Sequence, residues 1–212
     1  MKMAGGATED DIVIGNAFDK YGSRNPIVRW MMKGFDDALA SLMARTDAKA
    51  IHEIGCGEGF WTIQWLKQGL DVRGCDFSGK VVEIAQQNAA LNQVPPERFS
   101  VKSIYDLKAP ADGADLVVCC EVLEHLESPQ QGIAALQSIA TGYVILSVPR
   151  EPLWCLLNFA RGKYLRQWGN TPGHIQHWSK RQFVAFVSQY FDVVEVRSPL
   201  PWTMVLCKAR TR

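Results

Sequence analysis

Three glycines, Gly55, Gly57 and Gly59, follow an apolar stretch and precede residues with helical spacing. Glycine in a strand-to-helix turn allows the backbone to approach a ligand closely. The spacing is G-x-G-x-G, whereas a dinucleotide site needs a third glycine at the position that Phe60 occupies. Glu53 stands two residues before the first glycine, and a carboxylate there suits an ammonium group better than a pyrophosphate.

A second acidic residue, Asp76, closes the next apolar stretch, seventeen residues after Gly59. An acid at this place can accept hydrogen bonds from both hydroxyls of a ribose. An ammonium group together with an unmodified ribose, and no phosphate, describes S-adenosylmethionine. The run from Gly74 to Lys80 resembles a phosphate-binding loop, but Val81 cannot ligate Mg²⁺ and Asp76 would repel phosphate. We therefore exclude a nucleoside triphosphatase.

From residue 48 onward, short apolar stretches alternate with helical patterns. Strands are predicted at 49–54, 71–75, 98–102, 114–120 and 143–148, and helices at 60–68, 78–90 and 129–140. Such alternation builds a mostly parallel sheet covered by helices on both faces. The last two predicted strands, 191–197 and 203–208, are joined by a short link, so we expect them to be antiparallel.

Three helices begin with capping signals. The pair Asn25-Pro26 predicts an N-cap followed by proline at the first helical position. Ser128 with Gln131 predicts a capping box, and Ser179 and Gln182 are expected to cap the last helix.

Length and composition limit the class of protein. The 212 residues, 47% of them hydrophobic, suit one compact domain, and a net charge of +1 does not steer the chain onto nucleic acid or an anionic membrane. No apolar run approaches the ~18–20 residues that cross a bilayer, and the first residues lack the apolar region of a signal peptide. The six cysteines form no CxxC pair and are interpreted as buried free thiols, which favours a cytoplasmic protein and argues against a zinc site.

Three segments in order, Glu53–Gly59, Gly74–Ser78 and Asp115–His125, resemble class I S-adenosylmethionine-dependent methyltransferases. Within that superfamily the chain is similar to the group that includes the quinone-biosynthesis methyltransferases, and the likeness covers residues 48–150. The resemblance implies an α/β, Rossmann-like fold: a seven-stranded, mostly parallel sheet with the last strand antiparallel and helices on both faces. It also implies transfer of a methyl group from S-adenosylmethionine to a small-molecule acceptor by in-line displacement.

The resemblance further implies which residues bind the cofactor. The glycine loop should bind the methionine part of S-adenosylmethionine, and Asp76 should bind its ribose. The residues after the fourth strand should lie beside its sulfonium. Family members often carry Gly-Asp where this chain has Ser103-Ile104, so the adenine amine is left to backbone groups of residues 104–105 or to Asp106. The expected cofactor-binding residues are Glu53, Gly55, Cys56, Gly57, Gly59, Asp76, Phe77, Ile104, Tyr105, Glu121 and Val122.

Histidine is the usual general base near pH 7 where the acceptor is a hydroxyl. His125 follows the fourth strand, and His174 and His177 precede the last helix, so these three are the candidate catalytic residues. Oxygen methylation is slightly favoured; carbon or nitrogen methylation, or cofactor binding without turnover, are the alternatives. Two histidines without a third ligand predict no metal site. Glu124 is expected to be a solvated charge at a helix start, and His52 a structural residue.

The segment 151–178 has a composition of its own, with Trp154, Leu157, Arg161 and Leu165 at helical spacing. We interpret it as a lid over an apolar or aromatic acceptor; the alternative is a helix that packs on the sheet edge, and a membrane-surface role is less favoured. The expected acceptor-contacting residues are Tyr21, Trp154, Arg161, Tyr164 and Trp168.

The chain is expected to be a single domain of four consecutive parts. These are an N-terminal cap and helix (1–47), a cofactor-binding half (48–150), the lid (151–178) and a C-terminal helix with strands (179–212). Residues 1–20 are polar and are expected to be irregular. The expected partner is a small-molecule acceptor, with no nucleic acid and no stable membrane insertion.

Overall fold

A computed structural model describes residues 1–9, 12–16 and 19–210 of the chain. Within these residues, seven strands form a central sheet in the order β5-β4-β3-β6-β7-β9-β8. The strands are β3 (Ala50–Ile54), β4 (Asp71–Asp76), β5 (Phe99–Val101), β6 (Ala114–Cys120), β7 (Ala140–Pro149), β8 (Asp192–Arg197) and β9 (Trp202–Lys208). The helices are α1 (Pro26–Met43), α2 (Phe60–Lys67), α3 (Gly79–Leu91), α4 (Pro129–Ile139), α5 (Leu153–Ala160) and α6 (Lys180–Val187), with 3₁₀ turns η1 (Pro96–Arg98), η2 (Ile104–Asp106), η3 (Leu123–His125) and η4 (Leu165–Gln167).

Strand β9 runs antiparallel to both of its neighbours, β7 and β8, whereas β3 to β7 pair in parallel. This confirms the predicted fold class, and every predicted strand and helix of the sheet region is present. The strand order places β3 between β4 and β6. From β3 the chain builds one half of the sheet with β4 and β5, and then crosses to the other side of β3 to build the other half from β6 onward. In open α/β sheets, ligands bind at such a point, outside the carboxyl ends of the strands.

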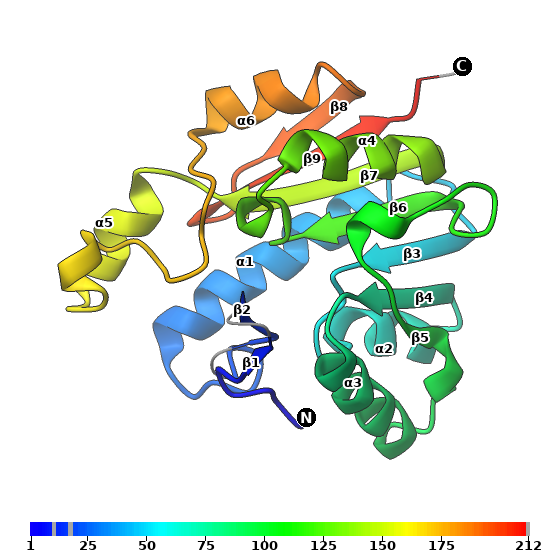
Figure 1. Ribbon diagram of the computed structural model, residues 1–212, viewed down its shortest axis with the longest axis horizontal. Helices are drawn as coiled ribbons and strands as arrows, with labels where there is room; N and C mark the ends of the chain where they lie inside the picture. The colour runs from blue at the N-terminus through cyan, green and yellow to red at the C-terminus, as the bar shows by residue number, and fades with distance from the viewer. Residues whose placement is uncertain (10–11, 17–18, 211–212) are drawn as a thin grey trace.

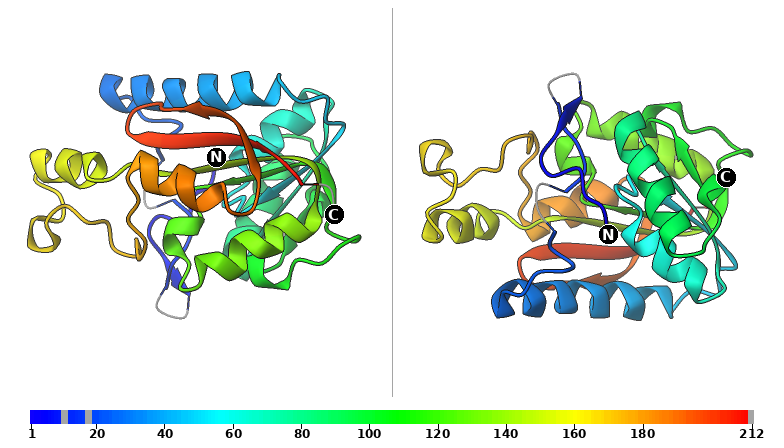
Figure 2. Two further views of the ribbon diagram at one scale, coloured as in Figure 1. Left: turned by 90° about the horizontal axis from the view of Figure 1, so that it is seen from above. Right: turned by 90° about the horizontal axis from the view of Figure 1, so that it is seen from below.

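Side chains of the central strands alternate between two apolar layers. On β6, Leu116 and Val118 pack with α1, while Val117 and Cys119 pack with α4 and α6. Figure 2 shows α1 on one side of the sheet and α4 with α6 on the other. Both faces are therefore covered, as parallel sheets require. No helix in the described part of the chain is both long and apolar enough to cross a membrane.

Two of the three predicted caps are confirmed. The Asn25 side chain accepts a 2.9 Å hydrogen bond from the Ile27 N–H, and Ser179 forms the capping box with Gln182. The capping box predicted at Ser128 is wrong, because its side chain makes no capping hydrogen bond. Its ψ is 71°, whereas ψ is 121° at Asn25 and 160° at Ser179, so the backbone does not aim the hydroxyl at the helix N-terminus.

The N-terminal segment is more regular than predicted. Residues Thr8–Glu9 (β1) pair in antiparallel fashion with Ile12–Val13 (β2). Residues 10–11 and 17–18 of the segment 1–20 lie outside the described residues. The carboxylate of Glu58, in the glycine loop, accepts hydrogen bonds from the backbone N–H groups of Ala4 (3.1 Å) and Asn16 (2.8 Å). The N-terminal segment therefore packs against the glycine loop.

The lid projects from the body of the molecule (Figure 1) and contains a shorter helix than the spacing predicted. Helix α5 ends at Ala160, and Leu165 starts a separate turn. Gly162 adopts a positive φ of 68°, and the Asn158 side chain donates to the Gly169 carbonyl at 3.0 Å. These contacts fold the chain back, so a continuous helix over residues 154–165 is wrong.

Candidate functional site

The glycine loop lies at the carboxyl end of β3, against the turn that follows β6. Gly55 and Gly59 adopt φ values of +75° and +84°, which side chains other than glycine rarely tolerate. The N–H groups of Gly55 and Cys56 donate to the Cys75 carbonyl on β4, at 2.8 and 2.9 Å. A Cβ atom on Gly55 would lie 2.3 Å from Cγ2 of Val122. Glycine is therefore required for this close approach.

Asp76, the last residue of β4, faces the glycine loop. The Gly57 N–H donates to its Oδ2 at 3.1 Å and the Ser78 N–H to its Oδ1 at 3.1 Å. Burial raises the pKa of Asp76, and these two hydrogen bonds oppose that shift. The next residue, Phe77, is exposed at the same edge. The structure thus brings together the loop and the acid that spacing predicted to share one ligand.

Glu53 is 2% exposed and belongs to the same site. Its carboxylate accepts hydrogen bonds from the N–H of Thr62, at 3.0 Å, and from the Thr62 hydroxyl. Burial raises the pKa of Glu53 to about 8. The ring of Tyr21, an expected acceptor contact, stacks on Phe60 with centroids 3.6 Å apart, so the segment before α1 packs on the start of α2.

Two further acids follow β6. Glu121 has a φ of +58° and accepts hydrogen bonds from the Ser147 hydroxyl (3.0 Å) and the Trp202 indole (2.6 Å). Burial raises the pKa of Glu121 to about 7. Glu124 is 1% exposed, and neither of its carboxylate oxygens has a hydrogen-bond partner among the described residues. The prediction of a solvated Glu124 is wrong, because η3 turns its side chain inward instead of starting a surface helix.

Burial, and then the neighbouring Glu121 charge, raise the pKa of Glu124. The ammonium group of Lys20 opposes this shift at both acids, so it lies within electrostatic reach of the pair. Sequence reasoning missed Lys20, Trp202 and the burial of Glu124. The spacing Glu121-x-x-Glu124-His125 is a signal that could have pointed to Glu124, whereas Lys20 and Trp202 come from distant parts of the chain and carry none.

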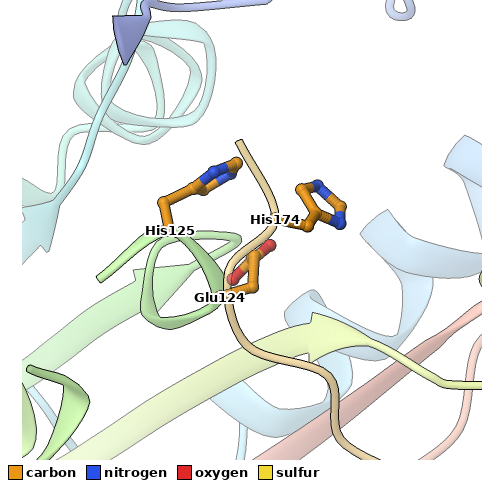
Figure 3. Close-up of side chains that lie close together, drawn as sticks. All are labelled: Glu124, His125 and His174. Carbon is orange, nitrogen blue, oxygen red and sulfur yellow. The ribbon is translucent and has the colours of Figure 1, made fainter. Parts of the chain in front are cut away.

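Figure 3 shows Glu124, His125 and His174 with their side chains close together. The His125 and His174 rings meet edge to face, with centroids 4.9 Å apart. His125 Nδ1 lies 2.8 Å from the Gly173 carbonyl oxygen, and the Trp154 ring packs along His174 at 5.7 Å. Burial lowers the pKa of both histidines, that of His174 to about 3. The structure therefore places two of the three predicted catalytic residues, His125 and His174, in contact with each other.

The same three residues, which we call the Glu124 group, could hold a divalent cation. One ligand atom from each of Glu124, His125 and His174 lies within 4.8 Å of the others. The expectation of no metal considered only the histidines 174 and 177, and Glu124 supplies the third ligand that it lacked. His177 is not part of this group: its Nδ1 lies 3.5 Å from Glu151 Oε1, beside Cys155.

The expected adenine contacts divide into buried and exposed groups. The Ile104 side chain is buried in the core that α4 covers, so only its backbone can face a ligand. Tyr105 is exposed, and its hydroxyl accepts a 3.3 Å hydrogen bond from the Ser128 N–H. Asp106 is exposed beside it.

The expected acceptor residues are not all at the site. Trp154 contacts His174, but Trp168 is 83% exposed near the outer end of the lid. Arg161 donates to the Asn158 side chain at 2.6 Å, within the lid itself. Tyr164 adopts a φ of 53° in the same outer turn. Helical spacing placed Arg161 on one face with Trp154, but α5 ends at Ala160, and the chain reversal after it separates Arg161, Tyr164 and Trp168 from Trp154.

Comparisons with known proteins agree with this geometry. Residues 51–141 match the profile of a family described as a methyltransferase domain. The ubiquinone biosynthesis O-methyltransferase of Albidiferax ferrireducens is 29% identical over 117 residues, which are 53% of this chain and 46% of that protein. The corresponding protein of Chromobacterium violaceum is 30% identical over 102 residues, 47% of this chain and 44% of that protein. The chain thus spans about half the length of the curated relatives it matches.

Among solved structures, magnesium protoporphyrin IX methyltransferase from Synechocystis, crystallised with S-adenosylhomocysteine, is similar in fold. Its TM-score is 0.66 at 22% identity, over 92% of this chain and 94% of that chain. The strand order, the glycine loop facing Asp76, and the match to the methyltransferase domain agree with one another. Residues 51–141 match a methyltransferase domain, and the chain is similar in fold to class I S-adenosylmethionine-dependent methyltransferases.

Proposed function

We propose that this chain binds S-adenosylmethionine at the carboxyl ends of β3, β4 and β6 and transfers its methyl group to an oxygen of a small-molecule acceptor. The observation that carries the proposal is the 3.1 Å hydrogen bond from the Gly57 N–H to Asp76. It holds a loop that can approach a ligand closely next to a carboxylate that can accept the ribose hydroxyls.

The charge of the site supports a cationic ligand. Glu53, Asp76 and Glu121 lie around the glycine loop and the turn that follows β6, and Glu124 is buried behind Glu121. Burial raises the pKa of these carboxyl groups, and a bound ammonium or sulfonium group would favour their charged forms, whereas a phosphate would oppose them. This supports the cofactor that the resemblance implies over a nucleotide.

Bound S-adenosylmethionine would supply a methyl group on a sulfonium, which is a good leaving group. The residues of the chain therefore have to position the acceptor, exclude water and manage one proton. Trp154 offers an apolar face beside His174, which suits an apolar or aromatic acceptor. The two curated relatives described above are named as O-methyltransferases of ubiquinone biosynthesis, so a phenolic ring is the first acceptor to test.

The contact of His125 with Gly173 supports proton transfer from a hydroxyl. A carbonyl oxygen can only accept, so His125 Nδ1, 2.8 Å away, carries the proton in the neutral ring. The lone pair of Nε2 then remains to accept a proton from the acceptor. A general base favours an oxygen acceptor, because a hydroxyl becomes a much better nucleophile when it loses its proton.

A divalent cation in the Glu124 group is a second way to activate the acceptor. The buried and unpartnered carboxylate of Glu124 favours it, because a buried carboxylate is costly without a partner. A cation held there would lower the pKa of a hydroxyl that it binds. Methyl transfer measured after treatment with a chelator distinguishes the general base from the cation. Activity that depends on the base alone should persist, whereas cation-assisted activity should be lost and should return when Mg²⁺, Mn²⁺ or Zn²⁺ is added back.

Calorimetry with S-adenosylmethionine tests the cofactor. Asp76→Ala should weaken binding by about 10- to 100-fold, because it removes hydrogen bonds to a charged acceptor. Asp71→Ala is the matched control, since Asp71 begins the same strand at the opposite end and pairs with Arg98 on the surface. Equal affinity of the wild type and Asp76→Ala would refute the assignment of the ribose site.

Transfer of a labelled methyl group to a panel of catechols, phenols and amines tests the acceptor. His125→Gln should lower kcat by about 10²-fold or more while cofactor affinity is unchanged. Methylation of amines or carbon acids alone would support the alternative chemistry. Tight cofactor binding without turnover on any acceptor of the panel would support the alternative of a binding protein.

A further inference from the structure

A second group of ligand-type side chains lies at the base of the lid, formed by Glu151, Cys155 and His177. Glu151 Oε1 lies 3.2 Å from Cys155 Sγ and 3.5 Å from His177 Nδ1, and the three ligand atoms all lie within 4.8 Å of one another. We propose that these three residues bind Zn²⁺, with a water molecule as the fourth ligand, and that the cation fastens the two ends of the lid to each other. Carboxylate, thiolate and imidazole are the ligand types that Zn²⁺ takes in proteins.

Two of the three distances between the ligand atoms are close to those of a tetrahedral site. Zinc bonds of ~2.3 Å to sulfur and ~2.0–2.1 Å to nitrogen or oxygen imply edges of roughly 3.3–3.6 Å between ligand atoms. The distances from Glu151 Oε1 to Cys155 Sγ and His177 Nδ1, 3.2 and 3.5 Å, are close to those edges. The Glu151 carboxylate is therefore already placed to share a cation with the thiol and the imidazole.

Local structure orients two of the ligands. Cys155 lies in the first turn of α5, and Glu151 precedes that helix by two residues. The Cys155 N–H donates to Glu151 Oε2 at 3.2 Å, which leaves Oε1 directed at the thiol and the imidazole. Such outer hydrogen bonds to ligating carboxylates fix their orientation in metal sites.

Burial and charge also suit a cation that enters from solvent. The Glu151 side chain is 12% exposed and the His177 side chain 41%, so the group is sheltered on one side and open on the other. When Zn²⁺ binds, a zinc–sulfur bond forms and the Cys155 thiol proton leaves to solvent. The thiolate and the Glu151 carboxylate then balance the charge of the cation.

The position of this group gives the cation a structural effect. The Glu151 N–H donates to the Trp178 carbonyl at 2.9 Å, so the two ends of the lid already meet here. His177 lies on the returning end, three residues after His174. A cation that fixes His177 would also restrict the segment that carries His174 to the Glu124 group. Occupancy of the second group would therefore control the order of the lid and of one histidine at the candidate active site.

The test uses the full chain, reduced, stripped with a chelator and titrated with Co²⁺ as the probe. Thiolate ligation gives a charge-transfer band in the near ultraviolet that a site of carboxylate and imidazole alone cannot produce. The band should saturate with Co²⁺, disappear on addition of Zn²⁺, and be absent in Cys155→Ser. In His125→Gln, which lacks a ligand of the Glu124 group, it should saturate at one Co²⁺ per chain. His177→Gln should weaken Co²⁺ binding on the order of tenfold or more.

His125→Gln is the matched control, because it removes a histidine of the Glu124 group and should leave the band unchanged. Zn²⁺ should also protect Cys155 from alkylation and raise the Tm of the wild type but not that of Cys155→Ser. The absence of a charge-transfer band in the wild type, or its persistence in a folded Cys155→Ser variant, would overturn the proposal. These readouts do not depend on methyl transfer, so the outcome is separate from that of the proposed function.

Discussion

The Ile175 N–H donates a hydrogen bond of 2.8 Å to the carbonyl oxygen of Glu124. This bond, together with one from the Gln176 N–H to the same oxygen at 2.9 Å, fastens the returning end of the lid to η3. His174 is thereby held against His125, with ring centroids 4.9 Å apart. Both bonds come from the backbone, so the path of the chain, and not a side-chain preference, brings the two histidines together.

Replacing Glu124 by methionine should stabilise the fold. The buried carboxylate has no hydrogen-bond partner among the described residues, and an apolar side chain of similar length removes that cost of ~1–3 kcal/mol. At ~2–4 °C per kcal/mol for a chain of this size, Tm should rise by several degrees in a thermal scan at pH 7. Glu127→Met, at an exposed position three residues further along the chain, should leave Tm within about 1 °C. A lower Tm for Glu124→Met would contradict this account.

The two lid tryptophans should behave differently toward the acceptor. Trp154 packs on His174, so Trp154→Ala should raise the acceptor KM about tenfold or more through the lost aromatic face. Trp168 is 83% exposed, so Trp168→Ala should change KM by less than about twofold. Steady-state kinetics, with cofactor affinity measured in parallel, checks both. Comparable effects of the two variants would show that the outer lid closes onto the acceptor.

His52 should make stability fall as the solution becomes acidic. Its Nδ1 lies 2.9 Å from the Asp112 carbonyl oxygen, and burial lowers its pKa to about 4 in the folded chain. The unfolded chain, with a pKa of about 6.5, binds the proton first, so stability is complete above pH ~6.5 and is lost as pH falls toward 4. The loss amounts to ~3 kcal/mol at most.

Denaturant unfolding between pH 4 and 8 measures this effect. His52→Asn keeps a hydrogen-bond donor near the Asp112 carbonyl without a titrating ring, so its stability should vary less over that range. The same pH dependence in both proteins would assign the acid sensitivity to other groups.

Gly55 and Val122 should be coupled energetically. Gly55→Ala places a methyl group 2.3 Å from Val122 Cγ2 and also strains a φ of +75°, so we expect a loss of ~2–3 kcal/mol. In Gly55→Ala/Val122→Ala the steric part should be recovered, while ~1–2 kcal/mol of backbone strain remains. A double-mutant cycle by denaturant unfolding measures this coupling. Additive losses would mean that the two residues do not share the contact.

Most of the sheet and of the glycine loop could be predicted because their determinants are local. A strand, a glycine turn and a helix follow one another between Ala50 and Lys67, and the β4 residue that reaches their loop is fixed by the strand register, which pairs Ile54 with Cys75. Asp76, one residue later, then has to lie beside Gly57. The same local reasoning explains why the caps at Asn25 and Ser179 were predicted correctly.

The arrangement of the other site residues depended on contacts between distant segments. Glu124 has the sequence context of a surface charge, and the packing of η3 against α4 and β7 buries it. His174 and His177 are three residues apart, yet the first joins Glu124 and His125 while the second joins Glu151 and Cys155.

The amino-acid sequence determined the fold class, the cofactor-type loop and the acid that faces it, because spacing along strands and turns sets those positions. The tertiary structure decided which carboxyl groups are buried and which histidines lie next to each other. Burial and the hydrogen bonds that join the lid to η3 exist only once the chain has folded back on itself.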